Sequence, residues 1–92
     1  MTPTAANQTS ISVDEDMALG FGTMLVAESE EGDYEPAGMV DTIREARELA
    51  NENLKIRMNE LESGGHPMCP SRFVVWGRRY DGTYHIICTI DA

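Results

Sequence analysis

Two stretches of this chain, fifty residues apart, share one pattern. They are TMLVAESEEGDYEPAGMVDT at residues 23–42 and FVVWGRRYDGTYHIICTIDA at residues 73–92. In each, an acidic residue precedes a glycine between two apolar runs, a strong signal for a β-hairpin turn. Their gapless alignment contains three identical pairs: Gly32 and Gly82, Tyr34 and Tyr84, and Asp41 and Asp91. The sequence therefore predicts two related hairpins, a repeated supersecondary unit.

The segment between the hairpins has the pattern of an amphipathic helix. Thr42 and Glu45 form a predicted capping box, and Gly64 stops the pattern. Apolar residues recur at helical spacing at Ile43, Ala46, Leu49, Ala50, Leu54, Met58 and Leu61. The predicted fold is α+β with the order ββαββ, the helix covering one face of an antiparallel sheet. Its elements are a hairpin at 21–40, a helix at 42–63, a loop at 64–71 and a hairpin at 72–91.

Length and charge restrict both the architecture and the function. A chain of 92 residues has room for one core, which we assign to residues 13–92, with a flexible tail at 1–12. Sixteen acidic residues against seven basic ones give a net charge of −9, and residues 1–42 contain no Lys or Arg. Direct binding to a nucleic-acid backbone needs a basic face, so we exclude it.

The sequence shows neither a signal peptide nor an apolar run long enough to cross a membrane. We therefore expect no membrane association. A cytoplasmic location follows as the default, with both cysteines reduced.

Strand alternation predicts a second apolar face that the helix cannot cover. A two-residue turn at Asp81-Gly82 places Ile86 and Cys88 under the helix and His85 and Ile87 on the opposite face. The same count in the first hairpin places Pro36 under the helix and Glu35 and Ala37 opposite. An exposed apolar face with an aromatic anchor indicates an interface. The predicted partner-binding residues are Trp76, Val74, Ile87, Arg78, Met24, Val26 and Met39. The alternatives are coverage by the N-terminal segment and an ordinary exposed patch.

Two functions fit this pattern. The first is a non-enzymatic interaction module that binds a protein partner, or a second copy of itself as a homodimer, through the face around Trp76. The second is an acidic mimic of nucleic acid, of the anti-defence type, that occupies the basic cleft of a nucleic-acid-binding enzyme. Its decoy face would consist of Glu28, Glu30, Glu31, Asp33 and Glu35. Salt dependence separates the two functions, because contacts between charges weaken at high salt.

One motif has the composition of a metal site. His66-x-x-Cys69 and His85-x-x-Cys88 supply two imidazoles and two thiols, a donor set that suits tetrahedral zinc. Residues three apart in a strand point to opposite faces, so His85 and Cys88 are expected to diverge. We therefore predict no bound metal and no cofactor. The acidic residues lie in turns and on the helix surface, where a solvated role is the expectation, so we predict no catalytic residues.

Overall fold

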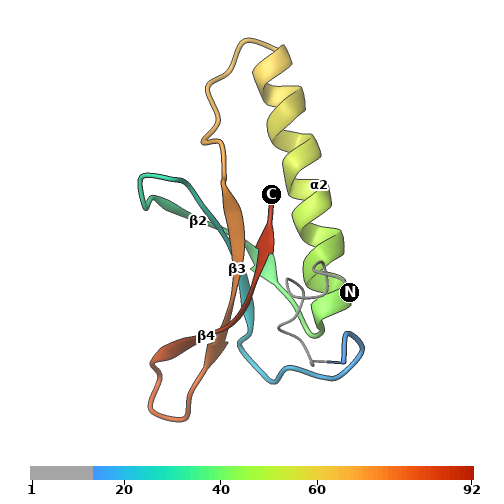
Figure 1. The fold of residues 1–92 in the computed structure, drawn as a ribbon, viewed down its shortest axis with the longest axis vertical. Coiled ribbons are helices and arrows are strands. Elements are labelled where there is room, and N and C mark those ends of the chain that lie inside the picture. Colours follow the sequence, from blue (N-terminus) through green and yellow to red (C-terminus); the bar gives the residue numbers. More distant parts are fainter. Residues whose placement is uncertain (1–13) are drawn as a thin grey trace, which may run out of the picture.

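The structure, a computed structural model, describes residues 14–92. They form four strands and one helix in the order ββαββ (Figure 1). The strands are β1 (Met24–Glu28), β2 (Tyr34–Met39), β3 (Arg72–Arg78) and β4 (Tyr84–Asp91), and the helix α2 (Ile43–Glu62) lies between β2 and β3. The predicted α+β class and element order are confirmed. The predicted flexible tail, residues 1–12, lies outside the described residues.

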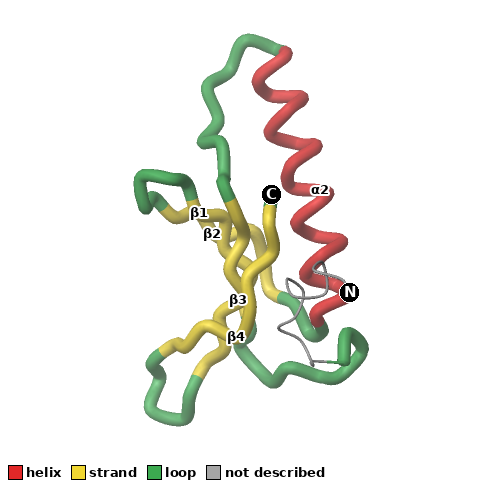
Figure 2. Tube along the Cα trace, viewed as in Figure 1, coloured by secondary structure: helices red, strands yellow, loops and turns green. Residues whose placement is uncertain are grey.

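The four strands make one sheet in the order β2-β1-β3-β4, and every neighbouring pair is antiparallel. The first strand of each hairpin is therefore central, and the second strand of each forms an edge. Figure 2 shows the sheet strongly twisted, with α2 lying on one side of it. The opposite side of the sheet faces away from the only helix that the structure describes.

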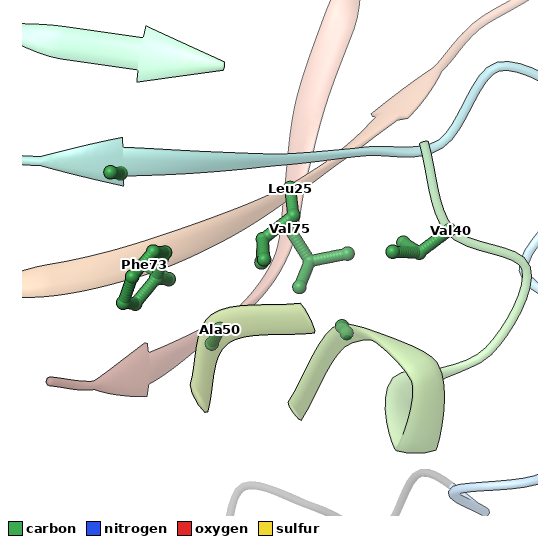
Figure 3. Close-up of a cluster of buried hydrophobic side chains, with 7 residues drawn as sticks. Leu25, Val40, Ala50, Phe73 and Val75 are labelled. Atoms are coloured by element: carbon green, nitrogen blue, oxygen red, sulfur yellow. The ribbon is translucent and has the colours of Figure 1, made fainter. Parts of the chain in front are cut away.

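The core forms between α2 and the two central strands. Leu25 of β1 and Phe73 and Val75 of β3 are fully buried, and Ala46 and Ala50 of α2 lie against them (Figure 3). The small alanine side chains let the helix backbone approach the sheet closely. Burial of these apolar side chains is the main contribution to the stability of a domain this small.

The start of α2 is fixed by Thr42, which is the N-cap residue as predicted. Its hydroxyl oxygen accepts a hydrogen bond from the Glu45 N–H at 3.1 Å. The Glu45 carboxylate accepts from the N–H of Asp41 at 2.8 Å, one residue before the cap. The predicted capping box therefore forms in a modified version, with both partners satisfying backbone donors.

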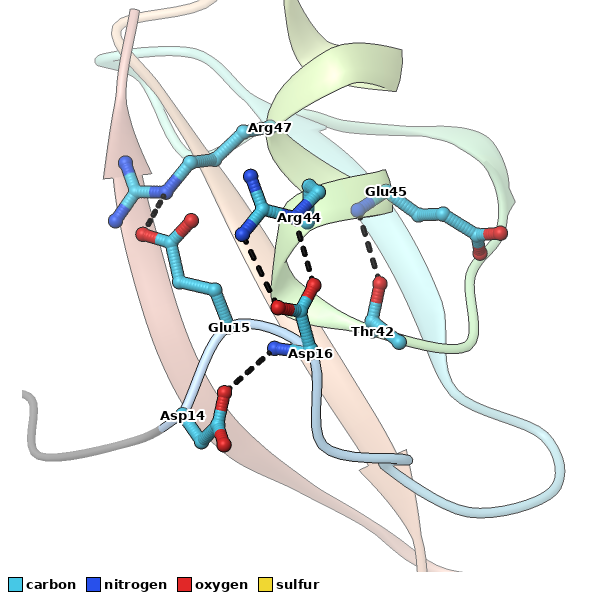
Figure 4. A network of polar contacts seen from close by, with 7 residues as sticks. All are labelled: Asp14, Glu15, Asp16, Thr42, Arg44, Glu45 and Arg47. Carbon is cyan, nitrogen blue, oxygen red and sulfur yellow. Dashed lines mark hydrogen bonds and ion pairs between the residues drawn. The ribbon is translucent and has the colours of Figure 1, made fainter.

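Acidic residues that precede the sheet are tied to the first turns of α2. Figure 4 shows Asp16 accepting two hydrogen bonds from Arg44, at 2.7 and 3.2 Å, and Glu15 paired with Arg47 at 3.0 Å. The Arg44 N–H also donates to the Glu15 carbonyl at 3.0 Å. Arg44 and Arg47 are exposed on α2, and their contacts hold residues 15 and 16 in place.

The second half of α2 extends beyond the sheet (Figure 1). Met58 and Leu61 are 62% and 55% exposed, so their predicted burial is wrong. Their spacing is correct for a core-facing stripe, but the sheet ends before it reaches them. At the boundary lies Arg57, whose side chain is 12% exposed and pairs with Glu35 of β2 at 2.8 Å.

The two hairpins have the same turn. The N–H of Ser29 donates to the Asp33 carbonyl at 2.9 Å, and the N–H of Arg79 donates to the Thr83 carbonyl at 2.8 Å. Gly32 and Gly82 have φ angles of +93° and +89°, which favour glycine. Each loop thus has three residues and ends with a left-handed glycine. The prediction of a two-residue turn at Asp81-Gly82 is wrong.

The hairpins also share a bulge at the same place. The first register shifts between Leu25 and Val26, with Ala37 as the extra residue on β2. The second shifts between Val75 and Trp76, with Ile87 as the extra residue on β4. Each position in the second bulge lies fifty residues after its counterpart in the first. The repeat in the sequence is therefore a repeat in backbone structure.

Candidate functional site

The sheet surface that faces away from α2, which we call the open face, is built by alternate residues of all four strands. Strand pairing and alternation assign its members. They are Met24, Val26 and Glu28 of β1; Tyr34, Pro36 and Met39 of β2; Arg72, Val74, Trp76 and Arg78 of β3; and Tyr84, Ile86, Thr89 and Asp91 of β4. Six of the seven predicted partner-binding residues belong to this set.

A row of three aromatic side chains crosses the open face. The ring of Trp76 lies 5.5 Å from that of Tyr34 and 5.9 Å from that of Tyr84, measured between centroids, and both pairs are tilted. Each such pair contributes about 0.5–1.5 kcal/mol beyond simple burial. The two tyrosines are the equivalent residues of the repeat, so one aromatic row joins both hairpins.

Val26 and Val74 are only 2% and 1% exposed, although they lie on the open face. They are absent from the core cluster beneath the helix, and they occupy neighbouring positions on β1 and β3. The larger side chains around them, including Trp76, therefore cover them. Their predicted role in direct contact with a partner does not fit this burial, and they support the aromatic row from below.

The exposed apolar area lies at the margins of the open face. Met39 is 61% exposed on β2, and Ile86 is 58% exposed on β4. Met24 lies between them and is half-buried. A partner that covered the aromatic row would therefore also bury side chains from both edge strands.

An ion pair borders the aromatic row. Glu28 and Arg72 form a hydrogen-bonded pair, and the Tyr34 hydroxyl interacts with the Glu28 carboxylate. The arginine, and secondarily the tyrosine, hold the pKa of Glu28 below its ordinary value. The same carboxylate raises the pKa of Tyr34, because ionisation would place two negative charges together.

The three-residue loop before β4 reverses the predicted faces of several residues. Trp76 pairs with Ile86 and Gly77 pairs with His85, so Ile86 lies on the open face and His85 does not. Ile87 packs against the core on the helix side. The predicted positions of Ile86, Ile87 and His85 are therefore wrong, because the three-residue loop shifts the alternation by one residue, and the bulge restores the predicted pairing only from Cys88 onward. On the helix side, Ile87 and His85 line a hollow of about 820 Å³ together with Leu19 and Phe21.

The first hairpin deviates in the same way. Glu35 pairs with Ala27 on the helix side, where it meets Arg57, and Pro36 pairs with Val26 on the open face. Ala37 packs against the core beneath the helix. The predicted faces of these three residues are wrong for the same reason. Sequence reasoning also missed Tyr34 and Tyr84 as site residues, although their equivalence in the repeat was a usable signal.

Comparisons with models of protein families, with curated proteins and with solved structures find no match. The open face therefore has to be interpreted from its own chemistry. Among the residues that the structure describes, no helix combines the length and the apolar character needed to cross a membrane.

The histidines and cysteines do not assemble with other ligands. Within residues 14–92, no group of three or more His, Cys, Asp or Glu side chains is arranged to hold a metal ion. His85 and Cys88 lie on the same side of the sheet, contrary to the prediction. The extra residue of the bulge lies between them and shifts the alternation by one, so they pair with Gly77 and Val75, which share a face. Cys88 is half-buried, and burial raises the pKa of its thiol, whereas Cys69 is exposed.

The acidic residues of the predicted decoy face do not share one environment. Glu28 is paired with Arg72 and Glu35 with Arg57, on opposite sides of the sheet. The three others, Glu30, Glu31 and Asp33, are exposed in the turn between β1 and β2. Of these five carboxylates, those without an arginine partner are therefore confined to the turn.

Proposed function

We propose that this protein is a non-enzymatic interaction module that binds a protein partner through the open face around Trp76. The observation that supports it most directly is the aromatic row on the sheet surface opposite α2, in which a half-buried Trp76 lies between the exposed Tyr34 and Tyr84. Tryptophan and tyrosine combine large apolar area with a hydrogen-bonding end, and they dominate the energetics of protein interfaces. Arg72, Glu28 and Arg78 supply a polar rim.

The partner in this proposal presents an apolar patch to the aromatic row. The proposal involves no cofactor, no metal and no nucleic acid, in keeping with the net charge of −9. The proposed location is the cytoplasm, which suits two free cysteines.

The nucleic-acid mimic has less support from the geometry. A decoy needs unpaired carboxylates spread along one surface, and two of its five predicted residues are neutralised by arginines on different faces. We keep it as a competing outcome of the experiment below.

The experiment compares capture of a partner from the native host by the wild-type protein and two variants. Trp76→Glu places a charge in the aromatic row, and Tyr80→Glu makes the same kind of change at a fully exposed turn position off the open face. Partner capture is expected to survive Tyr80→Glu and high salt and to be lost with Trp76→Glu. Circular dichroism verifies that each variant is folded.

The opposite pattern supports the mimic. Capture that survives Trp76→Glu, but is lost at high salt and in a variant with Glu30→Gln, Glu31→Gln and Asp33→Asn, contradicts the proposed function. The chain has one tryptophan, so a shift of Trp76 fluorescence on binding gives an independent reading of the contact.

A further inference from the structure

The two edges of the sheet are equivalent by the repeat but differ in chemistry. β2 forms one edge and β4 the other, and the two strands follow identical turns and carry bulges at matching positions. An edge strand exposes backbone N–H and C=O groups that can pair with another chain, unless the protein blocks them. Whether an edge can pair with another chain therefore depends on the residues whose backbone N–H and C=O groups point outward.

On β4, the ladder fixes which residues point their backbone outward. Arg79 and Thr83 are joined by a backbone hydrogen bond, so Thr83 directs its backbone groups toward β3. Because this direction alternates along a strand, the backbone N–H and C=O groups of Tyr84 and Ile86 point away from β3. Beyond the bulge, the bond from the Ala92 N–H to the Ser71 carbonyl, at 3.4 Å, sets Thr89 and Asp91 outward. Arg79 donates from its guanidinium to the Tyr84 carbonyl at 3.3 Å, which agrees with this direction.

The outer edge of β2 differs from that of β4. The bond from Ser29 to Asp33 sets Tyr34 and Pro36 outward, and the bond from Val40 to Thr23 sets Met39 outward. Pro36 has no N–H, so it cannot donate to an added strand, and proline is a common protection of sheet edges.

Pro36 and Ile86 occupy the same position of the repeat. Each follows the glycine of its turn by four residues, and the two are aligned by the offset of fifty residues that relates the hairpins. β2 is therefore blocked at the position where β4 offers a free N–H. Within residues 14–92, no strand pairs with the outer side of β4.

We infer that β4 pairs with β4 of a second copy of this chain, in antiparallel orientation, to form a homodimer with one continuous sheet. In one register, all four outward residues face each other: Tyr84 lies opposite Asp91 of the other copy, and Ile86 lies opposite Thr89. This register also brings the guanidinium of Arg79, which contacts Tyr84, near the Asp91 carboxylate of the other copy. The charges at the two ends of β4 are thus complementary in a strand that pairs with itself.

We favour a second copy over an unrelated strand as the partner of β4, because β4 itself supplies both sides of the pairing between Tyr84 and Asp91 and between Ile86 and Thr89. The open faces of the two copies then lie on the same side of the joined sheet, since the outward residues all have their side chains on that side. The inference concerns backbone groups at the edge, and it does not depend on the proposed function. It assigns self-association to β4 and leaves the aromatic row for a different protein.

The test introduces proline, which prevents pairing at residue 36 of β2, at the equivalent residue 86 of β4. Sedimentation velocity of the full chain over a dilution series is expected to show a dimer that dissociates on dilution, and Ile86→Pro is expected to show a monomer at all concentrations. The substitution removes an N–H that the intrachain ladder does not use, and β2 tolerates proline at this position. The matched control, Pro36→Ile, is expected to retain the dimer. Circular dichroism and thermal melts verify folding.

If Ile86→Pro does not fold, Thr89→Pro and Ile86→Lys test the same edge. Met39→Lys is the control for the lysine variant, because Met39 is similarly exposed on the same face but lies on the other edge. Lysine at residue 86 is expected to weaken the dimer, and lysine at residue 39 is expected to leave it unchanged.

Hydrogen exchange gives a direct readout in the wild-type protein. The N–H groups of Ile86 and Thr89 are expected to exchange slowly at high concentration and fast on dilution. The N–H of Met39, the equivalent of Thr89 on β2, is expected to exchange fast at both concentrations.

Two results overturn the inference. One is a monomeric full chain at high micromolar concentration, whether or not removal of residues 1–13 then permits dimers. The other is a dimer that persists in folded Ile86→Pro. If Trp76→Glu is then a folded monomer, self-association lies on the open face instead of the edge.

Discussion

Leu25 and Val75, fifty residues apart, are register partners at the centre of the sheet. The same offset relates the two hairpins, so each of these residues pairs with its own equivalent. The pairs on either side are exchanged by the same offset: Met24 pairs with Trp76, and their equivalents, Val74 and Val26, pair with each other. The hairpins are therefore related by a local twofold axis through this pair. α2 breaks the symmetry on one face, and the aromatic row preserves it on the other.

Phe73→Ala tests the core between β3 and α2. The side chain is fully buried against the helix, so its truncation is expected to reduce the free energy of unfolding by about 3–5 kcal/mol. That is a large share of the stability of a small domain. Urea denaturation followed by Trp76 fluorescence measures it. Tyr80→Ala, at a fully exposed turn position, is the control and is expected to change stability by less than about 0.5 kcal/mol.

Thr42→Ala tests the N-cap of α2. The variant loses the acceptor of the Glu45 N–H and is expected to cost about 1 kcal/mol of unfolding free energy. Thr42→Ser keeps the hydroxyl and is expected to retain most of the stability. Equal losses in the two variants would show that the hydroxyl contact does not stabilise the helix start.

Arg57→Met tests the contact that joins the overhanging half of α2 to the sheet and the following loop. The guanidinium pairs with Glu35 at 2.8 Å and donates to the Asn53 side chain at 2.7 Å and to the Met68 carbonyl at 3.0 Å. Its loss leaves these acceptors without their donor and is expected to cost about 1–3 kcal/mol. Lys55→Met, at an exposed position two residues earlier in α2, is the control. A similar effect of both substitutions would contradict a specific role for Arg57.

The contact between Tyr34 and Glu28 makes stability depend on pH at the alkaline end. Folding raises the pKa of Tyr34 above its ordinary value of 10.0, because Glu28 accepts its hydrogen bond and repels the phenolate. The contribution is complete below the pKa of the unfolded chain and is lost as the pH rises through the pKa of the folded protein. Unfolding free energy is therefore expected to fall in that range.

Ultraviolet absorbance of tyrosinate measures this titration directly. Tyr80→Phe and Tyr84→Phe together leave Tyr34 as the only tyrosine. In this background, Glu28→Gln is expected to return the pKa of Tyr34 toward its ordinary value. A titration that Glu28→Gln leaves unchanged would show that the two side chains are not coupled.

Much of the fold follows from local pattern. Acid-glycine turns, strand alternation and a capped amphipathic segment predict ββαββ, because each signal acts within a few residues. The faces of β2 and β4 next to their turns were mispredicted because a three-residue loop shifts the alternation by one residue, and a bulge restores it farther along each strand. The composition of the turns does not distinguish these geometries, and the bulge leaves no evident mark at Ala37 or Ile87.

The sequence by itself determined the two equivalent hairpins, the helix between them and the start of that helix at Thr42, because turn chemistry, periodicity and capping are local. Only the tertiary structure decided that β1 and β3 are the central strands, that Leu61 extends past the sheet, and that Tyr34, Trp76 and Tyr84 form one row. These features depend on contacts between residues far apart in the chain, where packing and ladder register fix positions that local preference leaves free.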